Sequence, residues 1–225
     1  KHLTYPLFVK PAKAGDSLGV DEHSLVHDRH QLQQKIESLA SQGYDDVLVE
    51  EYIAGREFTV LVAAGIVTRE CLSFTPIEYR FPKGYAYKTY ALKTSELHTD
   101  VNQPCQDRDL EIKLRQAAEK IFTGFSGVGY ARLDFRVNEK GEVYFLEINF
   151  TCSVFYEDGY EGSADYVLKY DPIGKAGFLK HMIAEGMSRY AAHQKKYRVK
   201  GNALNGYGIV AQQPLKQGDV IFKLE

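Results

Sequence analysis

The sequence has few cysteines, no long apolar run and almost no net charge, and each of these shortages excludes a class of protein. Its three cysteines, Cys71, Cys105 and Cys152, are odd in number and widely spaced, which fits neither a disulfide framework nor a zinc site. No apolar run approaches the roughly 18 residues of a transmembrane helix, and the first residues lack a signal-peptide pattern. We therefore expect reduced thiols, a cytoplasmic location and no membrane partner.

The balance of acidic and basic residues argues against a polyanionic partner such as nucleic acid. The 225 residues carry 28 basic and 30 acidic side chains, a net charge of −2, so there is no basic footprint for nucleic acid. The hydrophobic share of 44% is ordinary for a globular protein, and the length allows one large domain or two small ones.

The most informative stretch that is present reads as a β-hairpin. Residues 129–135 (GYARLDF) and 142–149 (EVYFLEIN) are rich in strand formers and flank a polar turn that contains Gly141. Side chains two apart in a strand share a face, so Arg132 and Asp134 point one way, and the polar residues of the second strand share a face likewise.

The pairing of the two strands decides which polar groups meet. If Val137 pairs with Glu142, then Arg132 lies opposite Glu147, with Asn149 on the same surface. A bulge at Gly141 would move this register by one residue.

The polar surface of this hairpin permits two interpretations. Asp134, Glu147 and the amide oxygen of Asn149 suit Mg²⁺, a hard cation that takes oxygen ligands and keeps substrate phosphates as others. The alternative is an exposed hairpin with an Arg132–Glu147 pair worth under about 1 kcal/mol.

A glycine-rich loop follows the first expected strand. Residues 5–11 (YPLFVKP) form a short apolar strand that carries Lys10, and residues 14–20 (AGDSLGV) come next. Such a loop turns backbone N–H groups toward a common point, as phosphate-binding loops do, and Lys10 adds positive charge there. An ordinary turn is the alternative.

Further elements follow from periodicity. Residues 28–42 predict an amphipathic helix ended by Gly43, and two more helices are expected to begin near Asp107 and at Pro172. Strands are expected at 47–53 and 57–63. The expected apolar positions of the three helices are Leu32, Ile36, Leu39 and Ala40; Leu110, Leu114, Ala118, Ile121 and Phe125; and Phe178, Leu179, Met182, Ile183 and Met187.

Five motifs in this order resemble the ATP-grasp superfamily, in particular its D-alanine–D-alanine ligase branch. They are residues 8–11 (FVKP), 15–20 (GDSLGV), 47–60 (VLVEEYIAGREFTV), 129–135 (GYARLDF) and 146–149 (LEIN). The resemblance implies an α+β fold in which two α+β subdomains with antiparallel sheets grip ATP. It also implies an N-terminal domain that precedes the part seen here.

The resemblance implies nucleotide-binding roles residue by residue. The lysine matching Lys10 contacts phosphates, and the acid matching Glu57 reaches the ribose. The loop with Gly15, Ser17 and Gly19 covers the phosphates, and Glu50, Glu51, Tyr52 and Ile53 line the adenine. Without the resemblance, Glu50 and Glu51 would be interpreted as the solvent-exposed end of a strand.

The resemblance also implies the metal and catalytic groups. Asp134, Glu147 and Asn149 match the magnesium ligands, with manganese as a substitute ion. Arg132 matches the arginine that steadies an acyl-phosphate intermediate, formed when a carboxylate attacks the γ-phosphate and then displaced by an amine. Ser163 is expected near a substrate carboxylate, although helix capping alone explains it equally well.

Two departures from the ligase pattern stand out. Residues 81–90 (FPKGYAYKTY) predict a mobile loop, and the resemblance implies that this loop closes over the site. Thr89 stands where the ligases have a lysine. Lys88 or Lys93 is a substitute, or either is an ordinary surface lysine. After Asn149 the Pro-Gly turn of the ligases is absent, so an amino acid carboxylate and an amine are expected as substrates without D-alanine being implied.

The chain is expected to divide into an ATP-grasp domain at 1–193, a linker at 194–200 and a β segment at 201–225. The last segment resembles the opening strands of SET methyltransferases, and a terminal hairpin is the alternative. The expected function is an ATP-dependent carboxylate–amine ligase, compatible with a homodimer. The alternatives are a nucleotide-binding module, an inactive fragment of a larger fusion protein, and an interaction domain with a relic site.

Overall fold

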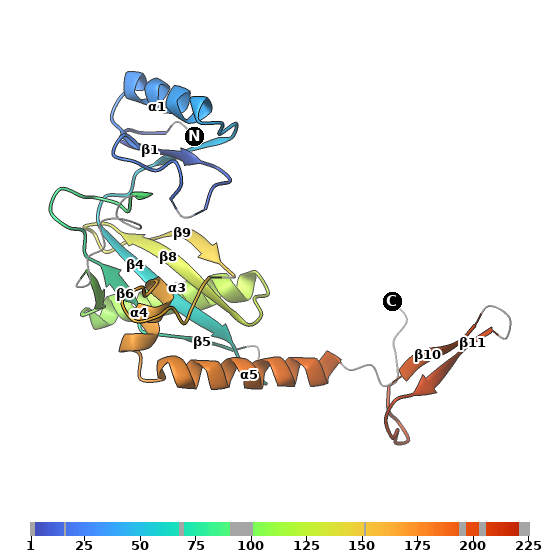
Figure 1. Cartoon of the computed structure of the whole chain (residues 1–225). Helices are drawn as coiled ribbons and strands as arrows, with labels where there is room; N and C mark the ends of the chain where they lie inside the picture. The colour runs from blue at the N-terminus through green and yellow to red at the C-terminus, as the bar shows by residue number, and fades with distance from the viewer. Residues whose placement is uncertain are drawn as a thin grey trace.

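The computed structural model describes residues 3–15, 17–67, 70–90, 101–150, 152–193, 197–202 and 206–220. A small three-stranded sheet carries the N-terminal motifs (Figure 1). β1 (Leu7–Pro11) lies between β2 (Leu25–Val26) and β3 (Val47–Glu51), and both pairings are antiparallel.

Helix α1 (Arg29–Ser41) covers this small sheet and begins where the sequence predicted. The side chain of Asp28 caps it by accepting from Gln31 N at 2.9 Å. Leu39 packs into the small core, but Ile36 is 37% exposed and Lys35 is buried in its stead. The predicted apolar stripe is therefore wrong at Ile36 and at Ala40, which is exposed as well.

The main sheet has six strands and holds the hairpin found in the sequence. Its order is β7 (Asn102–Pro104), β6 (Ile77–Tyr79), β4 (Arg56–Ala64), β8 (Tyr130–Val137) and β9 (Val143–Asn149), and β5 (Cys71–Ser73) also pairs with β4. All these pairings are antiparallel, as the resemblance implied.

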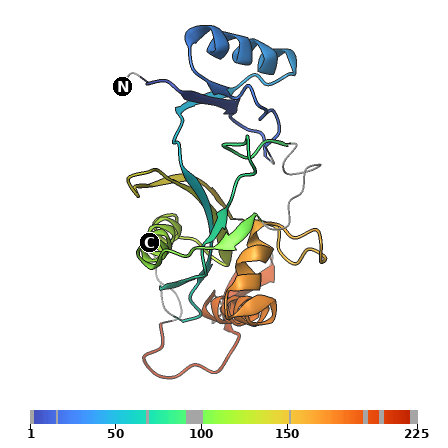
Figure 2. The ribbon, with the colours of Figure 1, turned by 90° about the vertical axis from the view of Figure 1, so that its left-hand side faces the viewer.

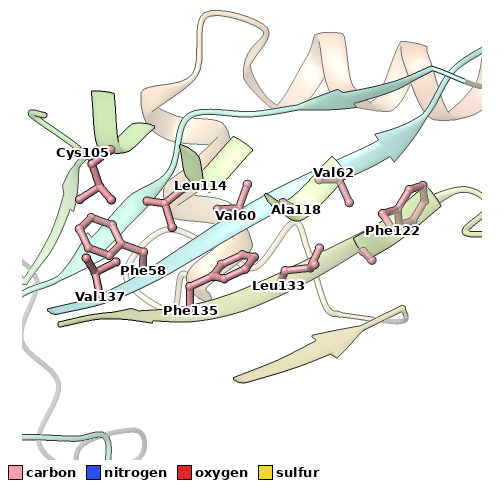
Figure 3. Packing of buried hydrophobic residues seen from close by; sticks show 12 residues of the cluster. Phe58, Val60, Val62, Cys105, Leu114, Ala118, Phe122, Leu133, Phe135 and Val137 are labelled. Atoms are coloured by element: carbon pink, nitrogen blue, oxygen red, sulfur yellow. The ribbon is translucent and has the colours of Figure 1, made fainter. Parts of the chain in front are cut away.

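One face of the main sheet packs against α3 (Arg108–Gly124), which Asp107 caps. Phe58, Leu133 and Phe135 of the sheet form the main core with helix residues that include Leu114 (Figure 3). The predicted stripe of α3 is correct at Leu110, Leu114 and Ala118, and Ile121 packs partly buried against the same core. It is wrong at Phe125, which is 62% exposed, while Phe122 is buried.

The other face is only partly covered by helices. Figure 2 shows α3 and the pair α4 (Ser163–Tyr170) and α5 (Gly174–His193) on opposite sides of the sheet. α4 and α5 bury Leu61 and Ala63 at one end of β4, together with Phe178. Toward the other end of β4 this face carries polar side chains such as Glu57 and Thr59, which belong to the candidate functional site. The predicted apolar positions of α5 are confirmed at Phe178 and Met182. They are wrong at Leu179, Ile183 and Met187, which are exposed.

The chain continues into a hairpin of β10 (Tyr197–Asn202) and β11 (Gly206–Ala211), which form a two-stranded sheet of their own. β10 thus begins within the stretch expected to be a linker. Among the residues that the structure describes, no helix is long and apolar enough to cross a membrane.

The contrast between Phe122 of α3 and Phe125, the residue that follows the end of this helix, tests the packing. Phe122→Ala should lower the free energy of unfolding by about 3–5 kcal/mol, because it empties a filled core position. Phe125→Ala, one turn along and exposed, should cost less than about 1 kcal/mol. Urea unfolding followed by circular dichroism measures both. Equal losses would contradict the assigned face of α3.

Candidate functional site

The pairing of β8 with β9 sets the geometry of the site. Asp134 lies opposite Glu147 and Arg132 lies opposite Asn149, so the predicted register with Arg132 opposite Glu147 is wrong. Val137 pairs with Val143 at the turn and not with Glu142, which shifts the register by one residue. A bulge between Asp134 and Phe135 shifts the register by one residue more. Because the two shifts add to two, the four polar side chains keep the common face that the sequence predicted.

The polar groups of this face are linked to one another. Arg132 Nη2 donates to Asp134 Oδ2 at 3.0 Å and lies 3.6 Å from Glu147 Oε1. Asn149 Nδ2 donates to the same Glu147 oxygen at 3.1 Å. From β4, Thr59 Oγ1 donates to Asp134 Oδ1 at 2.7 Å. Asp134 thus accepts from two sides and is fixed in orientation.

Burial and charge act against each other at Asp134. Burial alone would raise the pKa of its carboxyl, but the cations of Arg132 and Lys88 and the Thr59 hydrogen bond outweigh burial and lower the pKa. Asp134 is therefore an anion at neutral pH. Burial raises the pKa of the neighbouring Cys152 thiol to about 11, so that thiol is neutral and not a nucleophile.

The donor set fits a hard cation better than a soft one. Asp134, Glu147 and Asn149 offer two carboxylates and an amide oxygen, which are ligands that Mg²⁺ or Mn²⁺ accepts. In the described part of the chain, no group of three or more His, Cys, Asp and Glu side chains is placed to hold a metal ion. The predicted magnesium ligands lie on one face, with Asp134 opposite Glu147 and Asn149 hydrogen-bonded to Glu147, but they include only two carboxylates, and their role as metal ligands remains a prediction.

Lys88 belongs to the site and is not a surface lysine. Its Nζ lies 2.9 Å from Glu57 Oε1 and 4.5 Å from the centre of the Tyr79 ring. Burial alone would lower the pKa of Lys88, but the carboxylates of Glu57 and Asp134 outweigh burial and raise the pKa. The reading of Lys88 as an ordinary surface lysine is therefore wrong. Thr89 is 6% exposed, and Lys93 lies outside the described residues.

The small sheet brings the N-terminal motifs to the same region. Lys10 Nζ of β1 lies 2.7 Å from Glu50 Oε1 of β3. Glu51, the next residue, accepts from Thr4 N at 3.0 Å. Tyr52 then leaves β3, and its hydroxyl donates to Ala86 O at 2.8 Å, which joins this sheet to the 81–90 loop. Glu50 and Glu51 are thus both engaged by donors.

The glycine-rich loop contains a tight turn that packs closely against Pro11 of β1. Leu18 N donates to Gly15 O at 3.0 Å, and Ser17 has a φ of 58°. Gly19 has a φ of 75°, and a Cβ there would approach Pro11 Cγ to 2.6 Å, so no other residue fits without movement. Backbone turns and a phosphate-binding loop share this geometry, so both interpretations of the motif remain.

A buried lysine that the sequence analysis did not select supports this loop. Lys35 of α1 is 2% exposed, and its Nζ donates to Gly19 O at 3.0 Å and to Asp21 Oδ1 at 2.7 Å. Because a buried ammonium needs partners, these contacts bind the loop to the helix. The sequence feature that could have indicated this burial is the position of Lys35 next to the predicted apolar residues of α1.

Arg136 was also missed, although it continues the Arg132–Asp134 alternation along β8. Its Nη1 donates to Ile53 O at 3.0 Å, and only 3% of the residue is exposed. It therefore anchors the segment that the resemblance assigns to the adenine.

Ser163 is the first residue of α4, and the N-cap is Gly162, so the capping explanation of Ser163 is wrong. The helix start is held by Asp165, which is fully buried and accepts from Gly162 N at 3.2 Å and from Phe155 N at 2.8 Å. Asp165 thus orders the loop that follows β9. A substrate contact by Ser163 remains a prediction.

Two antiparallel sheets with their own helices, joined through a polar face, define the class: this is an ATP-grasp domain. The family model described as "D-ala D-ala ligase C-terminus" matches residues 1–154. The chain belongs to this family of D-alanine–D-alanine ligase C-terminal domains.

Individual relatives agree with the family. The D-alanine–D-alanine ligase of Legionella pneumophila (strain Corby) is 37% identical over 153 residues, covering 64% of this chain and 40% of the ligase. That of Acetivibrio thermocellus is 31% identical over 204 residues, covering 87% of this chain and 49% of the ligase. The chain therefore spans half or less of the length of these relatives.

Solved structures give the same fold. The VanG D-Ala:D-Ser ligase of Enterococcus faecalis has a TM-score of 0.59 and 26% identity over 83% of this chain and 50% of that chain. The Bacillus anthracis D-alanine–D-alanine ligase, solved with ATP, has a TM-score of 0.55 and 19% identity over 83% of this chain and 55% of that chain. The expected α+β fold is confirmed.

Replacing Lys35 tests its support of the glycine-rich loop. Lys35→Met should speed amide exchange at residues 18–24 about tenfold, because charge-assisted hydrogen bonds to the loop are lost. Exchange measured by NMR should leave the β4 and β8 amides unchanged. Gln34→Met, at the adjacent exposed position of α1, is the control. Loop exchange that is equal in both variants would contradict the role of Lys35.

Proposed function

We propose that this chain is the nucleotide-binding part of an ATP- and magnesium-dependent ligase that joins a carboxylate to an amine. The observation that carries the proposal is the grouping of Asp134, Glu147 and Asn149 around Arg132 on one sheet face. Lys88 extends this group to Glu57. Membership of the ligase family supports the assignment.

The nucleotide would be held by both sheets. Lys10 and the loop of Gly15, Ser17 and Gly19 would bind phosphates, since an ammonium and turned backbone N–H groups suit an anion. The segment Glu50, Glu51, Tyr52 and Ile53 would line the base, and Glu57 would reach the ribose. Asp134, Glu147 and Asn149 would hold Mg²⁺ or Mn²⁺, which supplies charge neutralisation at the phosphates when bound.

The chemistry follows from what must be stabilised. A carboxylate oxygen attacks the γ-phosphorus, the bond to the β-phosphate oxygen breaks, and ADP leaves with an acyl phosphate as product. An amine then attacks the acyl carbon and inorganic phosphate leaves, which gives the amide after loss of a proton. Arg132 and Lys88 would be the cations that stabilise the growing negative charge.

Amino acids are the proposed substrate class, with Ser163 as a candidate contact for a substrate carboxylate. The relatives described above are named for joining D-alanine to D-alanine or D-serine. We propose 1–193 as the ATP-grasp part and the β10–β11 hairpin as the start of a separate segment. We also propose a cytoplasmic location and a homodimer as the assembly. Nucleic acid and membrane are not proposed as partners.

A second candidate is a nucleotide-binding module without turnover. Thr89 stands where the ligases have a lysine, and Lys88 is already paired with Glu57. Amide formation by a longer protein that contains these residues would exclude this candidate.

Calorimetric titration with a non-hydrolysable ATP analogue tests the site. The wild type should bind it more tightly with Mg²⁺ than without, and Glu147→Ala should weaken the magnesium-dependent binding at least about tenfold, since a carboxylate ligand is lost. Lys140→Ala, in the exposed turn of the same hairpin, is the control. Binding that ignores magnesium, or equal losses in the two variants, would count against the hairpin as the metal site.

A further inference from the structure

Arg136 joins three segments that lie far apart in the sequence. It belongs to β8, and its Nη2 donates to Ala86 O at 2.5 Å while its Nη1 donates to Ile53 O. Ile53 lies in the connection between β3 and β4, and Ala86 lies in the 81–90 loop. One guanidinium therefore ties this connection and this loop to the main sheet.

Aromatic rings and a second donor close around the same point. The guanidinium carbon of Arg136 lies 5.0 Å from the centre of the Tyr52 ring and 5.4 Å from that of Phe81. Ala86 O accepts from the Tyr52 hydroxyl as well. Arg136 Nε is buried without a hydrogen-bond partner, and it lies 3.8 Å from Glu57 Oε2.

Burial of Arg136 carries a free-energy cost that must be offset by its contacts. Burial of a guanidinium costs free energy unless its donors are used, and an apolar side chain would pack there without that cost. The two carbonyls that Arg136 satisfies belong to the connection beside the proposed base site and to the loop that carries Lys88. The core on the opposite sheet face, with Phe135 and Val137, does not involve it.

We propose that Arg136 is a positioning residue for the nucleotide. It fixes the Ile53 carbonyl, and it holds the 81–90 loop where Lys88 reaches Glu57. The inference rests on the proposed nucleotide site and deepens it, because it assigns the order of both segments to one side chain. Arg136 acts through these segments and does not take part in the phosphoryl transfer.

Hydrogen–deuterium exchange of the nucleotide-free protein tests the proposal first. Arg136→Met keeps the length of the side chain but removes its donors, so exchange in residues 52–54 and 85–88 should become about tenfold faster. The β4 and β8 amides should exchange as in the wild type.

Arg56→Met is the matched control. Arg56 lies on β4, pairs with Glu78 through two hydrogen bonds at 2.8 and 2.7 Å, and belongs to the opposite face of the sheet. It should leave exchange of the 85–88 segment unchanged. Equal exchange of this segment in wild type and Arg136→Met, or an equal increase in Arg56→Met, would overturn the proposal.

Nucleotide binding supplies a readout that a purely structural role would not change. Stopped-flow binding of a fluorescent, non-hydrolysable ATP analogue with Mg²⁺ should show about tenfold faster dissociation from Arg136→Met, and wild-type dissociation from Arg56→Met. Unchanged dissociation from Arg136→Met would overturn the nucleotide role.

The failures of the two proposals are distinguishable. If the wild type does not bind the analogue, the proposed function fails and the nucleotide role of Arg136 fails with it, while the exchange data still decide whether Arg136 orders the two segments. If Arg136→Met does not fold, Arg136→Lys replaces it, because lysine keeps the charge and loses the planar fork of donors. Exchange in 85–88 should then rise about threefold, and wild-type exchange would overturn the proposal.

Discussion

The site depends on one alternation of charge across the polar end of the main sheet. Arg132 lies between Asp134 and Glu147. Lys88 lies beside Glu57, and its charge helps to lower the pKa of Asp134. Neighbouring carboxylates repel unless a cation stands between them, and a buried cation is costly without an anion. Arg132 and Lys88 therefore lower the pKa of Asp134, and the carboxylates of Glu57 and Asp134 raise the pKa of Lys88, so each charge in the group is balanced by a neighbour of opposite sign.

The location of this group follows from the alternation of side chains in β4 and β8. Residues such as Phe58 and Phe135 point under α3, and the residues between them point to the opposite face. α4 and α5 cover the apolar end of that face, where Leu61 lies. The polar end instead meets the small N-terminal sheet and the 81–90 loop through the hydrogen bonds of Tyr52 and Arg136.

The common face of the polar residues in the hairpin could be predicted from the sequence, because a period of two survives any even shift of register. The register itself could not, since the sequence marked only Gly141 as a bulge position, and the bulge between Asp134 and Phe135, which leaves Leu146 unpaired, lies elsewhere. Burial of Lys35 and Arg136 was missed for a related reason. Long charged side chains are normally exposed, and only the folded chain shows the carbonyls that they satisfy.

The position of a bound nucleotide is the most direct test of this account. A crystal structure of the chain with Mg²⁺ and a non-hydrolysable ATP analogue should show the metal on Asp134 and Glu147. The base should lie beside Tyr52 and Ile53. Phosphates bound elsewhere, such as in the cavity beside α3 lined by Cys105, Arg108 and Arg115, would contradict it.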